Sequence, residues 1–373
     1  MMKKTVFGAI ALLTSFFIFL QIGDKFKNPI ISDYTIHDAS FIRWDDKLYL
    51  FTSCLAARDT SLKIKYNTVH IFEITDLQNW KYYKRAIGNQ DDDKLCDSAL
   101  NGCGIKYAMW APDIIKYQGK LLLFVALHNS FDNSKIAVFE SDSINKDFRF
   151  KNIVVSNIKQ DGDAYFKSRE IIDPYPFIYN DSLYLTFGSF ARNGNGKFDE
   201  KRRGIGTYIV PLEYGNNIKM KAKPVFLTDY YEGVNILQRN DKFILFGTNG
   251  AWTNHTYKIE YATSNNLYGP YKNHEGKYIS DTTNVNLGKS ILYTNNPSST
   301  FNGFGCMSHP IIDKDGRYWV LVHGHDLQQK PITQKNSKRE RYIFLIELLW
   351  DENDNPYFDI DAILNNNIKK PNL

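Results

Sequence analysis

A polar residue followed by two β-rich runs around a short turn recurs five times along the chain. In the stretch Ile171–Phe190, Asp173 precedes an apolar run, the chain turns at Asn180-Asp181, and a second run returns through Leu183–Phe187. Such an arrangement predicts a β-hairpin. The polar residues that lead the five copies are Asp38, Asp113, Asp173, Glu232 and His309.

A third β-rich run follows each predicted hairpin. These runs are residues 68–74, 135–141, 204–210, 256–262 and 342–348. Five small antiparallel sheets whose hairpin turns lie 60 to 75 residues apart indicate radial repetition, because a closed ring leaves only short edges. We therefore predict an all-β fold, a five-bladed β-propeller. A length of 373 residues suggests two or three domains, but the blades share one core, so residues 28–365 are predicted to form a single domain.

The first strand of each blade lies nearest the propeller axis, so four carboxylates and one histidine are expected to meet at one end of a central funnel. Any one of these carboxylates alone is typical of a strand start that bonds nearby backbone. Gathered in one pocket, they raise one another's pKa, and the fold gains nothing from that arrangement. Glycoside hydrolysis uses such a group, since it needs a carboxylic acid to protonate the leaving oxygen and a carboxylate to activate water or attack carbon.

Short motifs in the chain resemble glycoside hydrolase family 43, whose five-bladed propellers include inverting arabinanases, arabinofuranosidases and xylosidases. The phrases that carry the resemblance are Trp110-Ala111-Pro112-Asp113, Ile172-Asp173-Pro174 and Gly269-Pro270-Tyr271. The resemblance implies a catalytic set in which Asp38 is the base, Asp173 modulates the pKa of the acid, and Glu232 is the acid. It extends over nearly the whole chain after the first 23 residues.

Two further phrases, His37-Asp38 and Phe187-Gly188-Ser189-Phe190, are similar to those of endo-α-1,5-L-arabinanases. The resemblance therefore implies an inverting arabinan endo-1,5-α-L-arabinanase with an oligo- or polysaccharide substrate. An exo-acting α-L-arabinofuranosidase or β-xylosidase of the same fold stays open as an alternative. A carbohydrate-binding propeller without catalysis is a third hypothesis, but a degenerate site is expected to lose one of its three carboxylates.

Four residues are expected to contact substrate near the funnel. They are His37, Trp110, Asp113 and Phe190. An indole at the funnel mouth can stack on a sugar face, although a position in the core fits Trp110 nearly as well. The side chain of His37 can bond the substrate or simply cap a turn.

The blade-five motif of the family is altered here, because Cys306 directly follows Gly303-Phe304-Gly305. The resemblance to arabinanases implies a calcium ion with water ligands on the axis, and His309 is then the expected metal ligand. Calcium takes roughly six to eight oxygen ligands, so one histidine leaves the presence of the ion open. Two other departures are Ala39 in place of a proline and Gly233-Val234 after the predicted acid.

The first 23 residues are expected to be a signal peptide or an N-terminal membrane anchor. Lys3-Lys4 precede an uncharged, mostly apolar run from Thr5 to Ile22, and its 18 residues lie at the border between a signal peptide and a spanning helix. We expect a secreted or periplasmic monomer that meets a membrane only through this segment, if the segment is not cleaved.

The cysteines and the charge add two expectations. The four cysteines are Cys54, Cys96, Cys103 and Cys306. They fit an oxidising compartment, their three full disulfide pairings stay open, and their spacing lacks the tight pairs of a zinc site. The net charge is +5, and the basic runs at residues 201–203 and 335–341 are expected in solvated loops. A nucleic-acid partner is not predicted, because these runs form no basic stripe on a recognisable binding fold.

Overall fold

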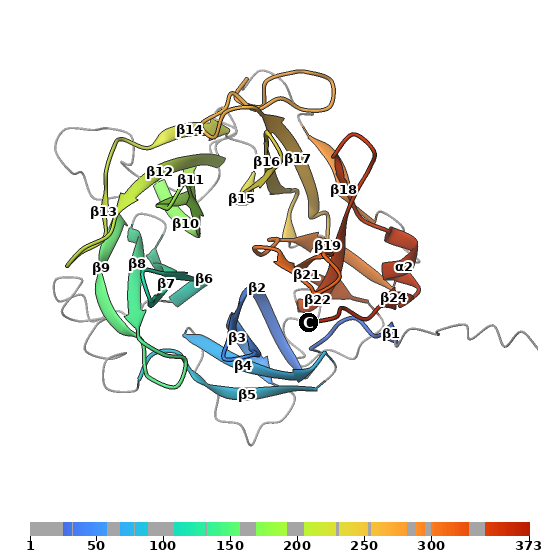
Figure 1. Ribbon diagram of the computed structural model, residues 1–373, viewed down its shortest axis with the longest axis horizontal. Helices are drawn as coiled ribbons and strands as arrows, with labels where there is room; N and C mark the ends of the chain where they lie inside the picture. The colour runs from blue at the N-terminus through green and yellow to red at the C-terminus, as the bar shows by residue number, and fades with distance from the viewer. Residues whose placement is uncertain are drawn as a thin grey trace, which may run out of the picture.

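The computed structural model describes residues 25–31, 33–57, 68–77, 79–88, 108–130, 133–156, 169–191, 205–228, 231–252, 255–281, 288–294, 300–327 and 340–373. These residues form five antiparallel sheets around a central axis (Figure 1). The predicted all-β fold and five-bladed β-propeller are therefore confirmed. The domain limits at residues 28 and 365 stay a prediction.

Each blade is a meander that starts near the axis and ends at the rim (Figure 1). Blade one contains β2 (Tyr34–Trp44), β3 (Lys47–Ala57), β4 (Val69–Asp76) and β5 (Asn79–Arg85). Blade two contains β6 (Ala108–Tyr117), β7 (Lys120–Ser130), β8 (Asn133–Ser141) and β9 (Arg149–Ser156). Blade three contains β10 (Arg169–Tyr179), β11 (Ser182–Ala191), β12 (Ile205–Glu213), β13 (Lys219–Met220) and β14 (Val225–Thr228).

The last two blades follow the same order. Blade four contains β15 (Glu232–Arg239), β16 (Lys242–Asn249), β17 (Lys258–Ser264) and β18 (Lys289–Leu292). Blade five contains β19 (Phe301–Gly305), β20 (Ile311–Ile312), β21 (Tyr318–Asp326), β22 (Tyr342–Trp350) and β23 (Pro356–Tyr357). The third run predicted for each blade coincides with β4, β8, β12, β17 or β22 to within two residues at each end, except that β12 ends three residues later than predicted.

Two-residue turns join the first two strands where the sequence predicts them. Both residues of the turns Asp45-Asp46 and Asn180-Asp181 have positive φ angles, between 47° and 60°. Such turns match the right-handed twist of the flanking strands, and aspartate and asparagine tolerate this conformation. The hairpin prediction is confirmed at these turns.

The ring is closed by the N-terminal segment, which runs along blade five. β1 (Lys25–Phe26) pairs with β24 (Ile368–Lys369), which follows α2 (Ile360–Leu364). The side chain of Asn28 bonds the backbone of Leu345 twice, at 2.9 and 3.0 Å. Both ends of the chain therefore hold the first and last blades together.

The inner strands carry a β-bulge at equivalent positions. In each of these bulges a residue has a positive φ angle between 44° and 65°, and the strand register shifts beside it. In blades one to four these residues are Asp38, Ala111, Asp173 and Gly233, each nine positions before the first residue of the next strand. Bulges bend a strand and redirect a side chain. In this protein the bulges determine which side chains of the inner strands point toward the propeller axis.

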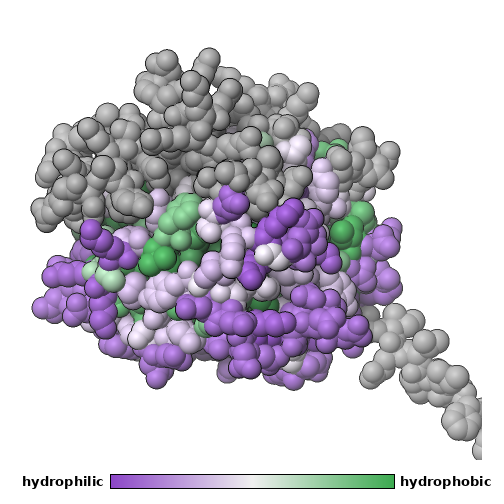
Figure 2. All heavy atoms as spheres, turned by 90° about the horizontal axis from the view of Figure 1, so that it is seen from above, coloured by the Kyte–Doolittle hydropathy of each residue, from purple (hydrophilic) through white to green (hydrophobic). Residues whose placement is uncertain are grey.

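The hydropathy of the surface and of the helices bears on where the protein is located in or outside the cell. In the side view of Figure 2 the described surface is mainly hydrophilic, with smaller apolar areas. Within the part of the chain that the structure describes, no helix is long and apolar enough to cross a bilayer. The predicted signal or anchor, residues 1–23, lies outside the described residues and stays a prediction.

Candidate active site

Carboxyl groups from blades one, two and three line one axial pocket, and they belong to Asp38, Asp113 and Asp173. Asp38 and Asp173 sit in the bulges of β2 and β10, with φ angles of 52° and 53°. Both line the pocket together with Gly233 and Cys306. Glu232 begins β15, one residue before the bulge glycine, and the Gly233 backbone N donates to Asp173 Oδ2 at 3.0 Å. This bond ties blade three to the residue that follows the predicted acid.

The carboxylate of Asp38 is surrounded by cationic or proton-donating groups. Its Oδ2 pairs with His37 Nδ1, its Oδ1 lies 3.0 Å from His323 Nδ1, and an Arg341 guanidinium nitrogen is 3.9 Å away. Burial opposes ionisation of Asp38, but these neighbours outweigh it and hold the pKa of Asp38 well below its ordinary value. Asp38 is therefore the ionised member of the group.

The two histidines beside Asp38 act as neutral donors. Burial, and then the Arg341 guanidinium, lower the pKa of His323 to about 4. An Arg341 guanidinium nitrogen is 3.3 Å from His323 Nε2, so this nitrogen accepts and the proton lies on Nδ1, which faces Asp38. Burial also lowers the pKa of His37. Arg341 is itself buried, with 8% of its surface exposed.

Glu232 has the opposite electrostatic environment. Burial raises the pKa of Glu232 to about 7, and the negative charge of Asp38 adds to this effect. The hydroxyl of Tyr257, a residue that directly precedes β17, donates to Glu232 Oε1 and partly opposes the rise. Glu232 can therefore carry a proton near neutral pH while Asp38 does not, which is the division that acid–base hydrolysis needs.

The pKa of Asp173 also lies well above its ordinary value. Burial is the main cause, and the charges of Glu232 and Asp38 contribute, while the bond from the Gly233 backbone N opposes the rise. Burial is the main cause of the raised pKa of Glu232, and Asp173 accepts the bond from the Gly233 backbone N next to it. The role of Asp173 as the residue that modulates the pKa of the acid stays a prediction.

Two of the five leading residues, Asp113 and His309, pair with each other, and Asp113 also lines the pocket with Asp38 and Asp173. Asp113 comes two residues after the bulge at Ala111, and His309 three residues after Cys306. His309 Nε2 lies 3.4 Å from Asp113 Oδ2, and its ring stacks on Tyr175 at a centroid distance of 3.6 Å. Burial raises the pKa of Asp113 well above its usual range and lowers the pKa of His309 to about 3.

The groups around His309 bear on the calcium ion that the family resemblance implies. The described groups that contact His309 supply one carboxylate and an aromatic face. Calcium takes roughly six to eight oxygen ligands, so water would have to supply most of them, and no step of the reaction is derived through the ion. The role of His309 as a metal ligand stays a prediction.

The expected substrate contacts have different outcomes. Trp110 is partly buried and its indole stacks on the His128 ring at 4.0 Å, so one of its faces is already covered. His37 is buried and bonded to Asp38, which makes it a neighbour of the base. Phe190 pairs with Glu170 through the backbone of β11, and its side chain lies outside the described residues. Contact of any of these residues with substrate stays a prediction.

Sequence reasoning missed three residues of this site, which are Tyr257, His323 and Arg341. They come from second or third strands or the residues just before them, where only the closed ring brings them to the axis. Cys306 also lines the pocket, and its φ angle of 50° is close to that of Asp38.

The cysteine pairing expected from the sequence needs one correction. Cys306 has a free thiol, which lies in the funnel near charged groups. This excludes all three pairings that would use all four cysteines. The side chain of Cys54, and both Cys96 and Cys103, lie outside the described residues.

Comparison with known proteins agrees with this geometry. A family model described as "Glycosyl hydrolases family 43" matches residues 26–356. An extracellular endo-α-(1→5)-L-arabinanase 2 from Bacillus subtilis is 22% identical over 280 residues, 68% of this chain and 53% of that protein. Xylosidase/arabinosidase 43B from Humicola insolens is 24% identical over 343 residues, 88% of this chain and 54% of that protein. The chain thus spans about half the length of the curated relatives it matches.

Solved structures share the fold at low sequence identity. An endo-arabinanase from Bacillus licheniformis has a TM-score of 0.64 and 20% identity, with 88% of this chain and 99% of that chain covered. An exo-1,5-α-L-arabinanase from a bovine ruminal metagenomic library has a TM-score of 0.64 and 19% identity, at the same coverage. The match of the family model over most of its length shows that this chain belongs to glycosyl hydrolase family 43.

Proposed function

We propose that the chain is an inverting endo-α-1,5-L-arabinanase that cleaves arabinose-containing polysaccharide. The observation that carries the proposal is the pair of opposite pKa shifts in one funnel, with the pKa of Asp38 well below its ordinary value and the pKa of Glu232 raised to about 7. A sugar-binding propeller has no need for one ionised and one protonated carboxyl group at the same pocket. A glycosidase needs both.

In the proposed reaction Asp38 activates a water molecule and Glu232 protonates the leaving glycosidic oxygen. The neutral His37 and His323 hold the Asp38 carboxylate in place, and Tyr257 orients the Glu232 carboxyl group. An inverting enzyme must fit both sugar and water between acid and base, which requires a carboxyl separation of roughly 6.5–9.5 Å. We expect Asp38 and Glu232 to face each other in that range.

The arabinan backbone as substrate is supported by the names of several similar proteins. The B. subtilis relative and the B. licheniformis structure are described as endo-arabinanases. The H. insolens relative is described as a xylosidase/arabinosidase, and a solved structure with the same TM-score is an exo-arabinanase. These two favour the alternative of an exo-acting α-L-arabinofuranosidase or β-xylosidase of the same fold.

Secretion is part of the same proposal. The B. subtilis relative is described as extracellular, and a polysaccharide too large to enter a cell must be cut outside it. Together with the basic residues and apolar run at the N-terminus, this supports an exported enzyme that acts on an oligo- or polysaccharide.

A substrate panel tests the proposal. The purified chain is incubated with linear arabinan, debranched arabinan, xylan and nitrophenyl arabinoside and xyloside, and products are separated by size. An endo-arabinanase releases a ladder of arabino-oligosaccharides from linear arabinan. Monosaccharide alone, or activity only on nitrophenyl glycosides, supports the exo-acting alternative. Binding without any release of reducing sugar would sink the catalytic proposal and leave the sugar-binding one.

A further inference from the structure

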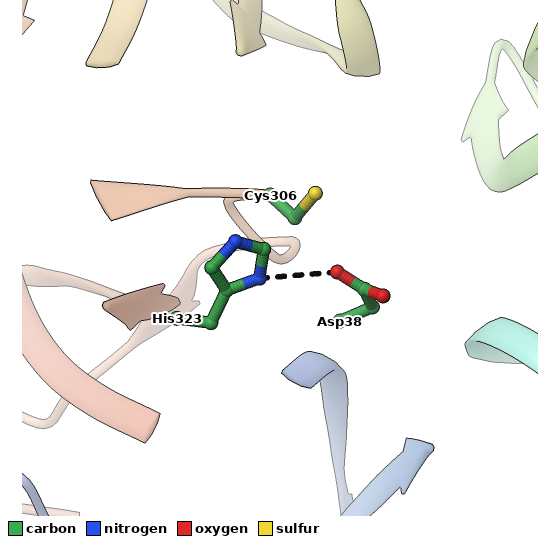
Figure 3. Close-up of side chains that lie close together, drawn as sticks. All are labelled: Asp38, Cys306 and His323. Carbon is green, nitrogen blue, oxygen red and sulfur yellow. Dashed lines mark ion pairs between the residues drawn. The ribbon is translucent and has the colours of Figure 1, made fainter. Parts of the chain in front are cut away.

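The blade-five bulge brings a thiol, an imidazole and a carboxylate together in the funnel. One ligand atom from each of Asp38, Cys306 and His323 lies within 4.8 Å of the other two. Figure 3 shows the three side chains close together, with the His323 ring paired to the Asp38 carboxylate and the Cys306 thiol beside both groups. We propose that these residues form a binding site for a borderline or soft divalent cation such as Zn²⁺, which removes Asp38 from its role as base.

The donor set decides which cations fit. Thiolate, imidazole and carboxylate are the three ligand types that zinc takes in proteins, commonly as three protein ligands and one water. Bond lengths of about 2.0–2.3 Å place zinc donors about 3.5 Å apart in a tetrahedron. The observed separations therefore need small side-chain rotations to close around the ion. Calcium and magnesium prefer oxygen ligands and fit this set poorly.

The cysteine is held in position by its backbone. Cys306 has a φ angle of 50°, and its backbone N donates to Thr248 Oγ1 at 2.8 Å. Its Sγ also packs against Gly233, where an added Cβ would lie only 3.1 Å away. These contacts come from the neighbouring blade and leave the thiol facing the funnel. The imidazole is equally fixed, since His323 is 1% exposed.

The charges of the site balance a divalent ion. The Asp38 carboxylate and a Cys306 thiolate together carry two negative charges, and the thiol proton passes to solvent when the metal binds. Burial, and then the charges of Asp38, Asp173 and Glu232, raise the pKa of the Cys306 thiol well above its ordinary value, so the bound ion must displace the thiol proton. The two ligand charges then match the charge of a divalent ion.

Arg341 is the group that opposes the cation. Its guanidinium nitrogen lies 3.9 Å from Asp38 Oδ1 and 3.3 Å from His323 Nε2. Metal coordination by Nδ1 moves the ring proton to Nε2, which then faces the guanidinium donor. Replacing Arg341 with glutamine removes the positive charge and supplies an acceptor for that proton. Arg341→Gln should therefore tighten zinc binding, an effect opposite to that of losing a ligand.

Direct binding tests the site without reference to catalysis. The full chain is stripped with a chelator and titrated with Co²⁺, whose thiolate charge-transfer absorption reports a bound cysteine, and with Zn²⁺ in a calorimeter. We expect the absorption band in the wild-type chain and its loss in Cys306→Ser. Because changing even an outer-shell partner costs about 10–100-fold in metal affinity, Cys306→Ser should weaken Zn²⁺ binding by about 100-fold. His274→Ala, which changes an exposed histidine, is the matched control.

Inhibition is the second readout and rests on the proposed function. For each variant, hydrolysis is compared with and without Zn²⁺, so that any change in the metal-free rate cancels. Zinc should inhibit the wild-type chain and the His274→Ala control, and inhibit Cys306→Ser only at about 100-fold higher concentration. If the wild-type chain shows no cobalt–thiolate band, or if Cys306→Ser keeps its zinc affinity, the site is refuted even if hydrolysis is confirmed. Tight binding without inhibition would leave the metal site standing and refute only the claim that the metal removes Asp38 from its role as base.

Discussion

Replacing Glu232 with glutamine should make the protein more stable at alkaline pH. Glutamine has nearly the same shape and keeps an oxygen that accepts the Tyr257 hydroxyl bond, but it cannot ionise. In the native protein the pKa of Glu232 is about 7, compared with 4.5 for an ordinary glutamate. Because the native state then binds this proton more tightly than the unfolded state, the free energy of unfolding falls as pH rises between those two values.

The size of this effect follows from the pKa. One pKa unit corresponds to about 1.4 kcal/mol, so ionisation of the buried Glu232 carboxyl costs the native state about 3 kcal/mol by about pH 8. Glu232→Gln should therefore have nearly wild-type stability at about pH 4.5 and exceed it by about 3 kcal/mol at about pH 8. Asp173 also has a raised pKa, so the variant keeps part of the pH dependence.

Urea denaturation at a series of pH values measures this difference. The midpoint and slope of each unfolding curve give the free energy of unfolding for the wild-type chain and for the variant. Glu352→Gln is the control, because it makes the same chemical change at an exposed glutamate. If Glu232→Gln and the wild-type chain show the same dependence of stability on pH, Glu232 is not the buried, proton-retaining acid described above.

Three further outcomes are expected. Asp38→Ala should lower kcat by about 10⁴-fold on every substrate, because general-base catalysis contributes up to that factor; a fall of less than tenfold would remove Asp38 as the base. Tyr257→Phe removes a bond that stabilises ionised Glu232, so the alkaline limb of the pH–rate profile should move to higher pH, and a shift to lower pH would contradict this. With calcium bound beside His309, prolonged chelation should lower Tm and added Ca²⁺ should restore it, because a ligand bound only to the folded state stabilises it; an unchanged Tm would count against the ion.

The architecture could be predicted because it is encoded locally. Each blade is a hairpin with a polar turn and a third strand, so five copies specify the ring without any long-range information. The catalytic candidates followed from the same repeat. Asp38 and Asp173 occupy equivalent bulges, and Glu232 directly precedes Gly233 in the bulge of blade four.

The position of each polar side chain along the propeller axis could not be predicted from the same pattern. A bulge adds one residue and shifts the register, and the alternation of polar and apolar residues does not reveal its position. Asp113 and His309 therefore seemed equivalent to Asp38, although neither occupies the bulge position and the structure pairs them with each other beside Tyr175. Groups such as Tyr257 and Arg341 have no local signature, because they reach the carboxylates only after different strands have closed into the ring.

The stereochemistry of the first-formed product tests the central claim most directly. Hydrolysis of a linear α-1,5-linked arabino-oligosaccharide is followed by proton NMR before the released sugar mutarotates. With Asp38 activating water and Glu232 acting as acid on opposite sides of the bond, the new reducing end should first appear in the β configuration. First appearance of the α configuration would mean retention through a covalent intermediate, and the roles given to Asp38 and Glu232 would be wrong.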